Sequence, residues 1–265
     1  MTRNYLASPI WKRPLRCAKS SPIRSLFSAR QLRRRDQSSL SADLFRRSPV
    51  SKKRERSTTH MPVSNEDAEY TRDQLVRFRK IIDRIRAEVP GGYKAHVLQS
   101  AGTLAFNPSM FDIVRAGIIL YGISPLPEFQ KLLKPVMTWK TRISLVRDMP
   151  KGSSISYGRT FVTPQKMRIA TLSAGYADGY PWYLSNRGAA VLVRGQRCAL
   201  VGRVTMDLMM IDVSKVNNLQ IGDEVVLMGR DGSQEVCCAE LAEKAGTIAW
   251  EIVTRIGARV RRVYV

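Results

Sequence analysis

Cysteine and histidine are both scarce in this chain of 265 residues, which contains four cysteines and two histidines. Cys17, Cys198, Cys237 and Cys238 have none of the spacings of a metal site, and the adjacent pair argues against a disulfide framework. No run approaches the roughly 18 consecutive apolar residues of a membrane-spanning helix. The sequence therefore favours a folded protein of a reducing compartment, with no metal site and no membrane span.

Acidic residues are nearly absent from the start of the chain, where arginine is abundant. Residues 1–56 hold 16 lysines and arginines against three acids, so they carry +13 of the net charge of +22. No helical or strand periodicity persists there, and we expect a disordered basic tail over residues 1–57.

Three roles are open for this tail. An arginine- and serine-rich start without acids is typical of an organellar transit peptide, a basic arm attracts nucleic acid without sequence preference, and a tail can also lack any role. We expect a cytoplasmic protein, or an organellar one if residues 1–35 act as a transit peptide. We expect neither a membrane nor nucleic acid as a partner.

Helical and strand-like segments alternate after the tail. An apolar stripe at spacings of three and four predicts a helix with the buried positions Leu75, Phe78, Ile82, Ile85 and Val89. A strand over 93–98, a short helix over 100–106 and a buried strand over 112–121 follow it. This order is typical of a parallel α/β architecture, which we assign to residues 58–130.

The pattern changes after residue 130. Short strand-like runs follow one another between turn signals such as Pro150-Lys151-Gly152, which predicts a mostly antiparallel β domain over 131–265. We expect one helix inside it and a closing strand over 259–265. The stripe of that helix is Leu241, Ala245, Ile248, Ile252 and Ile256. The predicted fold class is therefore α/β plus all-β.

Two tyrosines lie beside glycines at the ends of strand-like runs, in Ser-Tyr-Gly-Arg-Thr-Phe at 156–161 and Gly-Tyr-Ala-Asp-Gly-Tyr-Pro at 175–181. A tyrosine needed only for packing does not require neighbours without side chains, so both motifs indicate phenols presented to a ligand. Both motifs, in this order and about one strand apart, resemble the C-terminal domain of alanine racemase.

That resemblance implies a fold and a reaction. The family joins a barrel of eight β/α units to a β domain and holds pyridoxal 5′-phosphate. It interconverts L- and D-alanine with two bases, a lysine that also holds the cofactor and a tyrosine that reaches in from the partner subunit. The resemblance therefore implies a partial (β/α)8 barrel over 58–130, followed by the β domain. As a partner it implies a second copy of this chain or a full-length homologue.

Tyr157 is the residue that the resemblance assigns to catalysis. A phenol has an ordinary pKa of about 10, so it is a poor base at neutral pH unless a cation or hydrogen bond stabilises the phenolate. Strand alternation would place Arg159 on the same face as Tyr157, and we therefore expect Arg159 to supply that cation. The alternative is a strand tyrosine that only packs at a domain interface.

The resemblance assigns three residues to the substrate. Tyr176 matches the tyrosine that narrows the substrate entrance, and Met206 and Asp207 match the segment that lines the pocket near the substrate carboxylate. Alternatives remain open for each of them: Tyr176 could shield a turn, Met206 could pack in the core as methionines usually do, and Asp207 could cap a turn.

The resemblance assigns seven residues to binding of the cofactor: His60, His96, Ser100, Arg115, Gly117, Ile118 and Trp250. A small hydroxyl at a helix start suits a phosphate, and an arginine facing the pyridine nitrogen only donates, which keeps that nitrogen unprotonated. Trp250 stands where the family usually has a tyrosine, and its indole N–H can still donate one hydrogen bond.

The resemblance covers residues 58–265, whereas the family's cofactor lysine comes earlier, in a strand that the basic tail replaces here. We therefore expect a truncated alanine racemase that is inactive by itself. The alternatives are a non-catalytic partner or scaffold subunit that keeps the β domain, and a racemase of broader amino-acid specificity.

Overall fold

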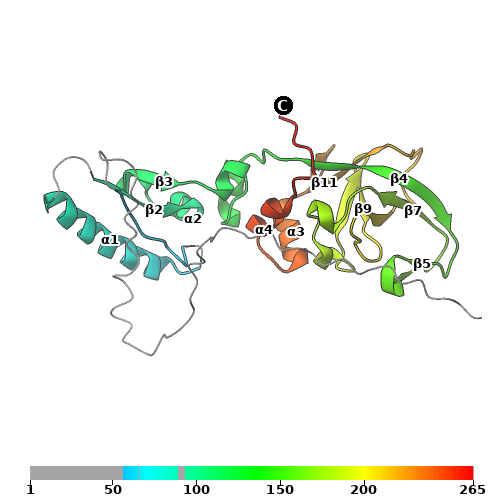
Figure 1. Cartoon of the computed structure of the whole chain (residues 1–265), viewed down its shortest axis with the longest axis horizontal. Helices are drawn as coiled ribbons and strands as arrows, with labels where there is room; N and C mark the ends of the chain where they lie inside the picture. The colour runs from blue at the N-terminus through cyan, green and yellow to red at the C-terminus, as the bar shows by residue number, and fades with distance from the viewer. Residues whose placement is uncertain (1–55, 65, 89–92, 265) are drawn as a thin grey trace, which may run out of the picture. The chain divides into compact units, whose positions relative to one another are not determined.

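The computed structural model describes three stretches of the chain: residues 56–64, 66–88 and 93–264. The tail predicted over 1–57 lies outside the described residues up to position 55, and so does Val89 at the end of the predicted helical stripe. Arg56 and Ser57 are described, and they open the first strand. From there on the chain forms a small α/β part and a larger β domain (Figure 1).

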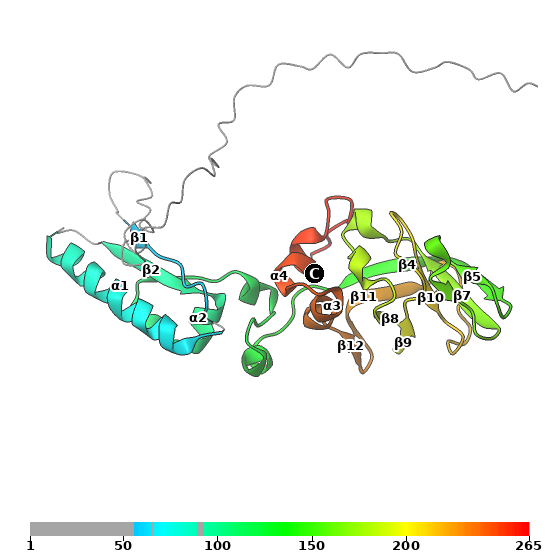
Figure 2. The same cartoon turned by 90° about the horizontal axis from the view of Figure 1, so that it is seen from below.

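The α/β part is a three-stranded parallel sheet, in the order β1-β2-β3, with two helices. Its elements are β1 (Arg56–Thr58), α1 (Ala68–Glu88), β2 (Lys94–Gln99), α2 (Ser100–Ala105) and β3 (Ile113–Arg115). The predicted stripe is confirmed for Leu75, Phe78 and Ile82, which share a core with Ala95 and Val97 of β2. α1 thus covers one face of the sheet (Figure 2), and the predicted parallel α/β architecture is confirmed.

The strand predicted over 112–121 is wrong beyond its first residues. β3 ends at Arg115, and a 3₁₀ turn (Ile118–Tyr121) follows and closes at Gly122 with a left-handed φ of 72°. The amide of Gly117 donates to Ser100 Oγ at 2.9 Å instead of to a neighbouring strand. Of the apolar run only Ile118 is buried, and it packs into the core of the β domain, whereas Leu120 and Tyr121 are exposed.

The β domain is built on one antiparallel sheet in the order β10-β7-β4-β11-β8-β9, with β12 paired to β11. Figure 1 shows the long β4 beside β7. The sheet strands are β4 (Trp139–Met149), β7 (Met167–Leu172), β8 (Ala190–Val193), β9 (Gln196–Ala199), β10 (Met209–Asp212), β11 (Glu224–Asp231) and β12 (Gln234–Val236). The predicted antiparallel β domain is therefore confirmed.

Two short strands outside this sheet, β5 (Ser154–Ile155) and β6 (Phe161–Val162), form a hairpin. The hairpin rests on a small apolar cluster that includes Ile155, Ile169 and Val201. Its loop therefore has a packed base, and this loop carries the first tyrosine motif.

Two expectations for the end of the chain are wrong. The single predicted helix is two helices, α3 (Cys238–Ala245) and α4 (Ala249–Arg255), because Gly246 adopts a left-handed φ of 70° and ends the first. The closing strand over 259–265 is absent from its described part, 259–264. Arg262 folds that segment on itself by donating to the carbonyl oxygens of Ile256 and Val260. None of the described helices is both long enough and apolar enough to cross a membrane.

Candidate active site

Tyr157 lies on a strained 3₁₀ turn (Tyr157–Arg159) in the loop of the β5–β6 hairpin. Ser156 before it has φ 64° and ψ −175°, a conformation found almost only in glycine. The hydroxyl of Ser156 donates to the carbonyl oxygen of Arg203 at 2.7 Å, which holds this conformation in place. The turn directs the Tyr157 side chain away from the hairpin core, and the residue is 72% exposed.

Tyr176 begins a second 3₁₀ turn (Tyr176–Asp178), which leaves the end of β7. Its amide donates to the carbonyl oxygen of Thr205 at 3.0 Å, and the next amide, of Ala177, donates to that of Met206 at 2.9 Å. A Cβ on Gly175 would lie only 2.3 Å from the Thr205 oxygen. The glycine of this motif is therefore required for the two backbones to approach each other.

Met206 and Asp207 lie in the loop that joins this contact to β10. Thr205 closes the loop, because its hydroxyl donates to the carbonyl oxygen of Leu208 at 2.9 Å. Met206 is 54% exposed, so its alternative role as a core residue is not supported. The carboxylate of Asp207 accepts from Arg259 Nη2 at 2.7 Å.

These loops enclose one hollow of about 550 Å³. Four residues that the sequence assigns to catalysis and substrate binding line it together: Tyr157, Tyr176, Met206 and Asp207. The remaining lining residues include Trp182, Arg203 and Leu208. The hollow thus combines two exposed phenols, apolar walls and one guanidinium.

Arg159, the cation expected beside the phenol of Tyr157, is hydrogen-bonded to a residue of β5 instead. Its Nε donates to Ser154 Oγ at 2.9 Å, and residues 157–159 are a turn, so strand alternation does not apply to them. Arg203 is the cation in the hollow, and a Cβ on Gly158 would lie 2.9 Å from its Cζ. The expectation for Arg159 is therefore wrong. The signal for Arg203 was its place three residues before Met206 in a segment already assigned to the substrate.

The second cluster of assigned residues lies at the carboxyl ends of the parallel strands. Arg115 ends β3, and its Nη1 donates to Thr58 Oγ1 at 2.8 Å and lies 2.9 Å from His96 Nδ1. Its Nη2 donates to the carbonyl oxygens of Thr59 at 3.0 Å and Val97 at 3.1 Å. Because a guanidinium only donates, His96 accepts through Nδ1. Burial lowers the pKa of Arg115 from its ordinary value.

Further assigned residues of the α/β part follow the other two strands of the parallel sheet. His60 follows β1 and is exposed, while Ser100 follows β2 and is buried. Ser100 Oγ accepts from the amide of Gly117, which leaves the hydroxyl hydrogen of Ser100 available to a ligand. A Cβ added at Gly117 would lie 3.6 Å from Ser100 Oγ, which is an ordinary van der Waals contact, so the backbone of Gly117 lies close beside this hydroxyl.

Trp250 is the one assigned residue that lies on a helix of the β domain. It is 40% exposed on α4 and lines neither this hollow nor the other cavity described below. Sequence reasoning also missed Thr58, whose hydroxyl accepts from Arg115. The signal for Thr58 was its position at the end of a strand, directly before the Thr-His pair.

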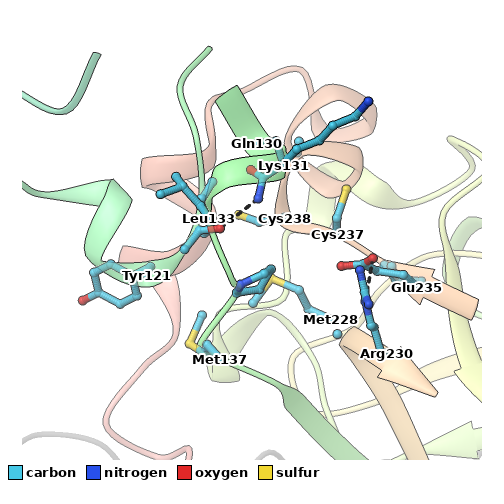
Figure 3. Close-up of a pocket in the computed structure, with 16 residues that line it drawn as sticks. Tyr121, Gln130, Lys131, Leu133, Met137, Met228, Arg230, Glu235, Cys237 and Cys238 are labelled. Atoms are coloured by element: carbon cyan, nitrogen blue, oxygen red, sulfur yellow. Dashed lines mark hydrogen bonds and ion pairs between the residues drawn. The ribbon is translucent and has the colours of Figure 1, made fainter. Parts of the chain in front are cut away.

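A second cavity, of about 390 Å³, lies where the segment 121–137 packs against β11, β12 and α3. Figure 3 shows Met137, Met228 and Leu133 among its walls, with the Arg230–Glu235 ion pair at one side. None of the residues assigned to the reaction lines it. The chemistry-bearing side chains of the β domain lie instead around the first hollow, lined by Tyr157, Tyr176, Met206 and Asp207, which we call the tyrosine hollow.

Comparison with known proteins gives one consistent match. The family model for the alanine racemase C-terminal domain matches residues 136–264, and that for the N-terminal domain matches residues 51–125. The alanine racemases of Halothermothrix orenii and Symbiobacterium thermophilum are each 45% identical to the chain, over 78% of it and 55% of their own length. The chain thus spans about half the length of the curated relatives it matches.

Solved structures agree with this match. The alanine racemase of Streptomyces coelicolor A3(2) superposes with a TM-score of 0.73 at 37% identity, over 78% of this chain and 55% of that one. The alanine racemase of Bartonella henselae, solved with covalently bound pyridoxal phosphate, superposes with a TM-score of 0.70 at 29% identity. That match covers 79% of this chain and 56% of the other.

Proposed function

Because the chain belongs to the alanine racemase family, we propose that it supplies the tyrosine base for the interconversion of L- and D-alanine. The observation that carries this proposal is the shared hollow, where the exposed phenol of Tyr157 lies with Tyr176, Met206 and Asp207. A base on one face of an α-carbon must be exposed and held rigidly, and the strained turn of Tyr157 meets both requirements.

The α/β part offers groups that fit pyridoxal 5′-phosphate. Within the described chain, the Nε–H of Arg115 has no acceptor, although both terminal nitrogens of the guanidinium are engaged. One fixed donor is thus left for a ring nitrogen, which it would keep unprotonated. The hydroxyl of Ser100 and the backbone at Gly117 and Ile118 suit the phosphate. His60 and His96 belong to the same set, and Trp250 would add an indole donor.

In this proposal each residue has a limited task. When bound, the cofactor supplies the electron sink that makes the α-proton of the amino acid removable. Tyr157 exchanges that proton on one face of the α-carbon. Tyr176 and Met206 restrict which side chain fits the hollow and exclude water, and the loop of Met206 and Asp207 receives the substrate carboxylate.

We infer that the chain by itself does not racemise alanine. The lysine of the parallel sheet, Lys94, opens β2 and so lies at the strand end opposite to Arg115 and Ser100. No other described lysine falls within β1, β2 or β3. The described part of the parallel sheet therefore offers no lysine at the site of Arg115 and Ser100, and we propose that a full-length homologue supplies the second base as the partner. A non-catalytic subunit remains the second candidate, because a lysine-free site is also what that role predicts.

A mixed assembly separates the two candidates. The chain is co-expressed with a full-length alanine racemase whose own tyrosine base is replaced by phenylalanine, and D-alanine formation from L-alanine is measured in the purified complex. The expected result is activity with the native chain and none with the Tyr157→Phe variant as matched control. A complex that forms but stays inactive with native Tyr157 would contradict the catalytic role and leave the non-catalytic one.

The isolated chain gives a second readout. It is incubated with pyridoxal 5′-phosphate, reduced with borohydride and digested, and labelled lysines are located by mass spectrometry. We expect no lysine to be labelled selectively over the others. A single preferred lysine would show that the chain holds its own cofactor amine, which would overturn the need for a partner.

A further inference from the structure

The C-terminal segment after α4 contacts both loops that line the tyrosine hollow. The amide of Gly257 donates to the carbonyl oxygen of Asp178 at 3.0 Å, which joins this segment to the turn of Tyr176. Arg262 folds the segment by donating to the carbonyl oxygen of Ile256 at 2.7 Å. Arg259 therefore lies between two attachments, the backbone hydrogen bond of Gly257 and the side-chain hydrogen bond of Arg262.

Arg259 extends its guanidinium to two carboxylates from different loops. Its Nη2 donates to Asp207 Oδ1 at 2.7 Å, and its Nε lies 3.4 Å from Asp178 Oδ1. The other oxygen of Asp178 accepts from the amide of Gly175 at 2.9 Å. One guanidinium thus joins the turn that carries Tyr176 to the loop that carries Met206, and a planar fork suits two acceptors at once.

The geometry points to Arg259 as a positioning residue that clamps the Tyr176 turn to the Met206–Asp207 loop and so sets the width of the hollow. The two loops already share the backbone hydrogen bonds from Tyr176 to Thr205 and from Ala177 to Met206. The clamp stabilises that contact at its solvent side, where a bare backbone pair would open most easily. Its functional consequence, a fixed substrate entrance, rests on the proposed function, while the clamp itself does not.

Hydrogen exchange on the full chain tests the clamp without any activity. Peptides covering residues 174–179 report the amides of Tyr176 and Ala177, and peptides covering β8 and β9 report the sheet. Since each such ion pair contributes modestly and Arg259 makes two of them, we expect Arg259→Ala to speed exchange at 174–179 by about threefold to tenfold, with the sheet peptides unchanged. The matched control is Arg230→Ala, which removes another exposed arginine–carboxylate pair, on the β11–β12 hairpin.

Two further variants test whether the planar pair of donors of Arg259 and its two carboxylate acceptors are both needed. Arg259→Lys keeps the charge and the fold but offers no planar pair of donors, so exchange at 174–179 should rise by a smaller factor. In the Asp178→Asn, Asp207→Asn double variant, adding Arg259→Ala should change exchange by less than about twofold, because both acceptors are already lost. Unchanged exchange in Arg259→Ala, or equal acceleration in the sheet peptides, would overturn the proposal.

The mixed assembly described above separates this proposal from the proposed function. There Arg259→Lys should raise KM for alanine severalfold, with a smaller change in kcat, because the entrance is loosened and Tyr157 is untouched. If exchange responds but the native mixed complex does not racemise alanine, the proposed function fails and the clamp stands. If the complex is active and exchange does not respond, the clamp fails alone.

Discussion

The guanidinium of Arg203 lies directly against the α-carbon of Gly158, so that a Cβ there would be 2.9, 3.0 and 3.1 Å from its Cζ, Nη1 and Nη2. These three similar distances mean that the flat face of the guanidinium covers the glycine. The turn of Tyr157 and the loop of Met206 are therefore packed together through an arginine whose guanidinium occupies the place that a side chain at position 158 would take.

A first prediction concerns this contact. Gly158→Ala must bear the penalty of a left-handed φ of 71° and also displace the guanidinium. The matched control is Gly188→Ala, with a φ of 66° and nothing within 4 Å of the added methyl group. We expect the control to lose about 1 kcal/mol of unfolding free energy, and Gly158→Ala to lose more, as measured by urea unfolding. Equal losses would show that Arg203 moves aside freely.

A second prediction compares two buried tyrosines. The hydroxyl of Tyr180 is buried and has no hydrogen-bond partner among the described residues, whereas that of Tyr93 is hydrogen-bonded to Ser57 Oγ. An unpaired buried hydroxyl is unfavourable, so Tyr180→Phe should leave the unfolding free energy unchanged or raise it by up to about 1 kcal/mol. Tyr93→Phe should lower it by about 1–2 kcal/mol, because Ser57 loses its partner. The reverse order in thermal unfolding would refute this assignment.

A third prediction follows from a buried thiol. Burial, and in second place the charge of Asp212, raises the pKa of Cys198 from 9.0 to about 11. The folded state then keeps a proton that the unfolded state releases above pH 9, so the unfolding free energy should fall by about 1.4 kcal/mol for each pH unit from about 9 to 11. The stabilisation that comes from keeping Cys198 protonated is complete below pH 9. It is lost as the pH rises through the pKa of Cys198 in the folded state.

Cys198→Ala tests this pH dependence. The variant should be less stable than the native chain at pH 8, and the gap should narrow between pH 9 and 10.5. Val191, which pairs with Cys198 in the register of β8 and β9 and is fully buried, gives a control without a titrating group. The gap between Val191→Ala and the native chain should stay constant over the same range. A constant gap for both variants would mean that Cys198 does not take part in the pH dependence.

The two glycine-flanked motifs were visible in the sequence, and their tyrosines, Tyr157 and Tyr176, line one hollow, while their roles toward a substrate stay predictions. The sequence was not sufficient to identify the cation beside Tyr157. That prediction assumed a strand through Arg159, whereas the backbone turns at Ser156 and Gly158 with positive φ. A hairpin of two-residue strands leaves too little periodicity to reveal such a turn.

The apolar run over 112–121 shows another limit. Its composition is that of a buried strand, but within it only Ile118 is buried and only Ile113–Arg115 form a strand. Short apolar runs do not distinguish a strand from a 3₁₀ turn that packs on another core. Likewise, residues 259–265 were expected to form a strand, while the contacts of Arg259 with the distant carboxylates of Asp178 and Asp207 depend on tertiary structure that no local pattern encodes.

A last prediction concerns Arg115, which has a structural role that can be separated from its proposed role toward the cofactor. Its Nη1 and Nη2 donate to groups in β1, in β2 and directly after β1, among them the hydroxyl of Thr58 and the carbonyl oxygens of Thr59 and Val97. A lysine keeps the charge but presents a single ammonium, which cannot reach acceptors spread over two strands. Carbonyl oxygens that lose a donor while partly buried destabilise the fold by about 1–3 kcal/mol.

We therefore expect Arg115→Lys to speed hydrogen exchange in peptides from β1 and β2 and to leave the sheet of β4, β7 and β11 unchanged. Arg72→Lys, at an exposed position of α1, is the control and should shift the unfolding free energy by less than about 0.5 kcal/mol. If Arg115→Lys left exchange in β1 and β2 at the native rate, the hydrogen bonds of Arg115 would contribute nothing to joining these strands. The only role left for Arg115 would then be to bind a ligand. Its Nε–H is available for this, because it is the one donor of Arg115 that the described chain does not use.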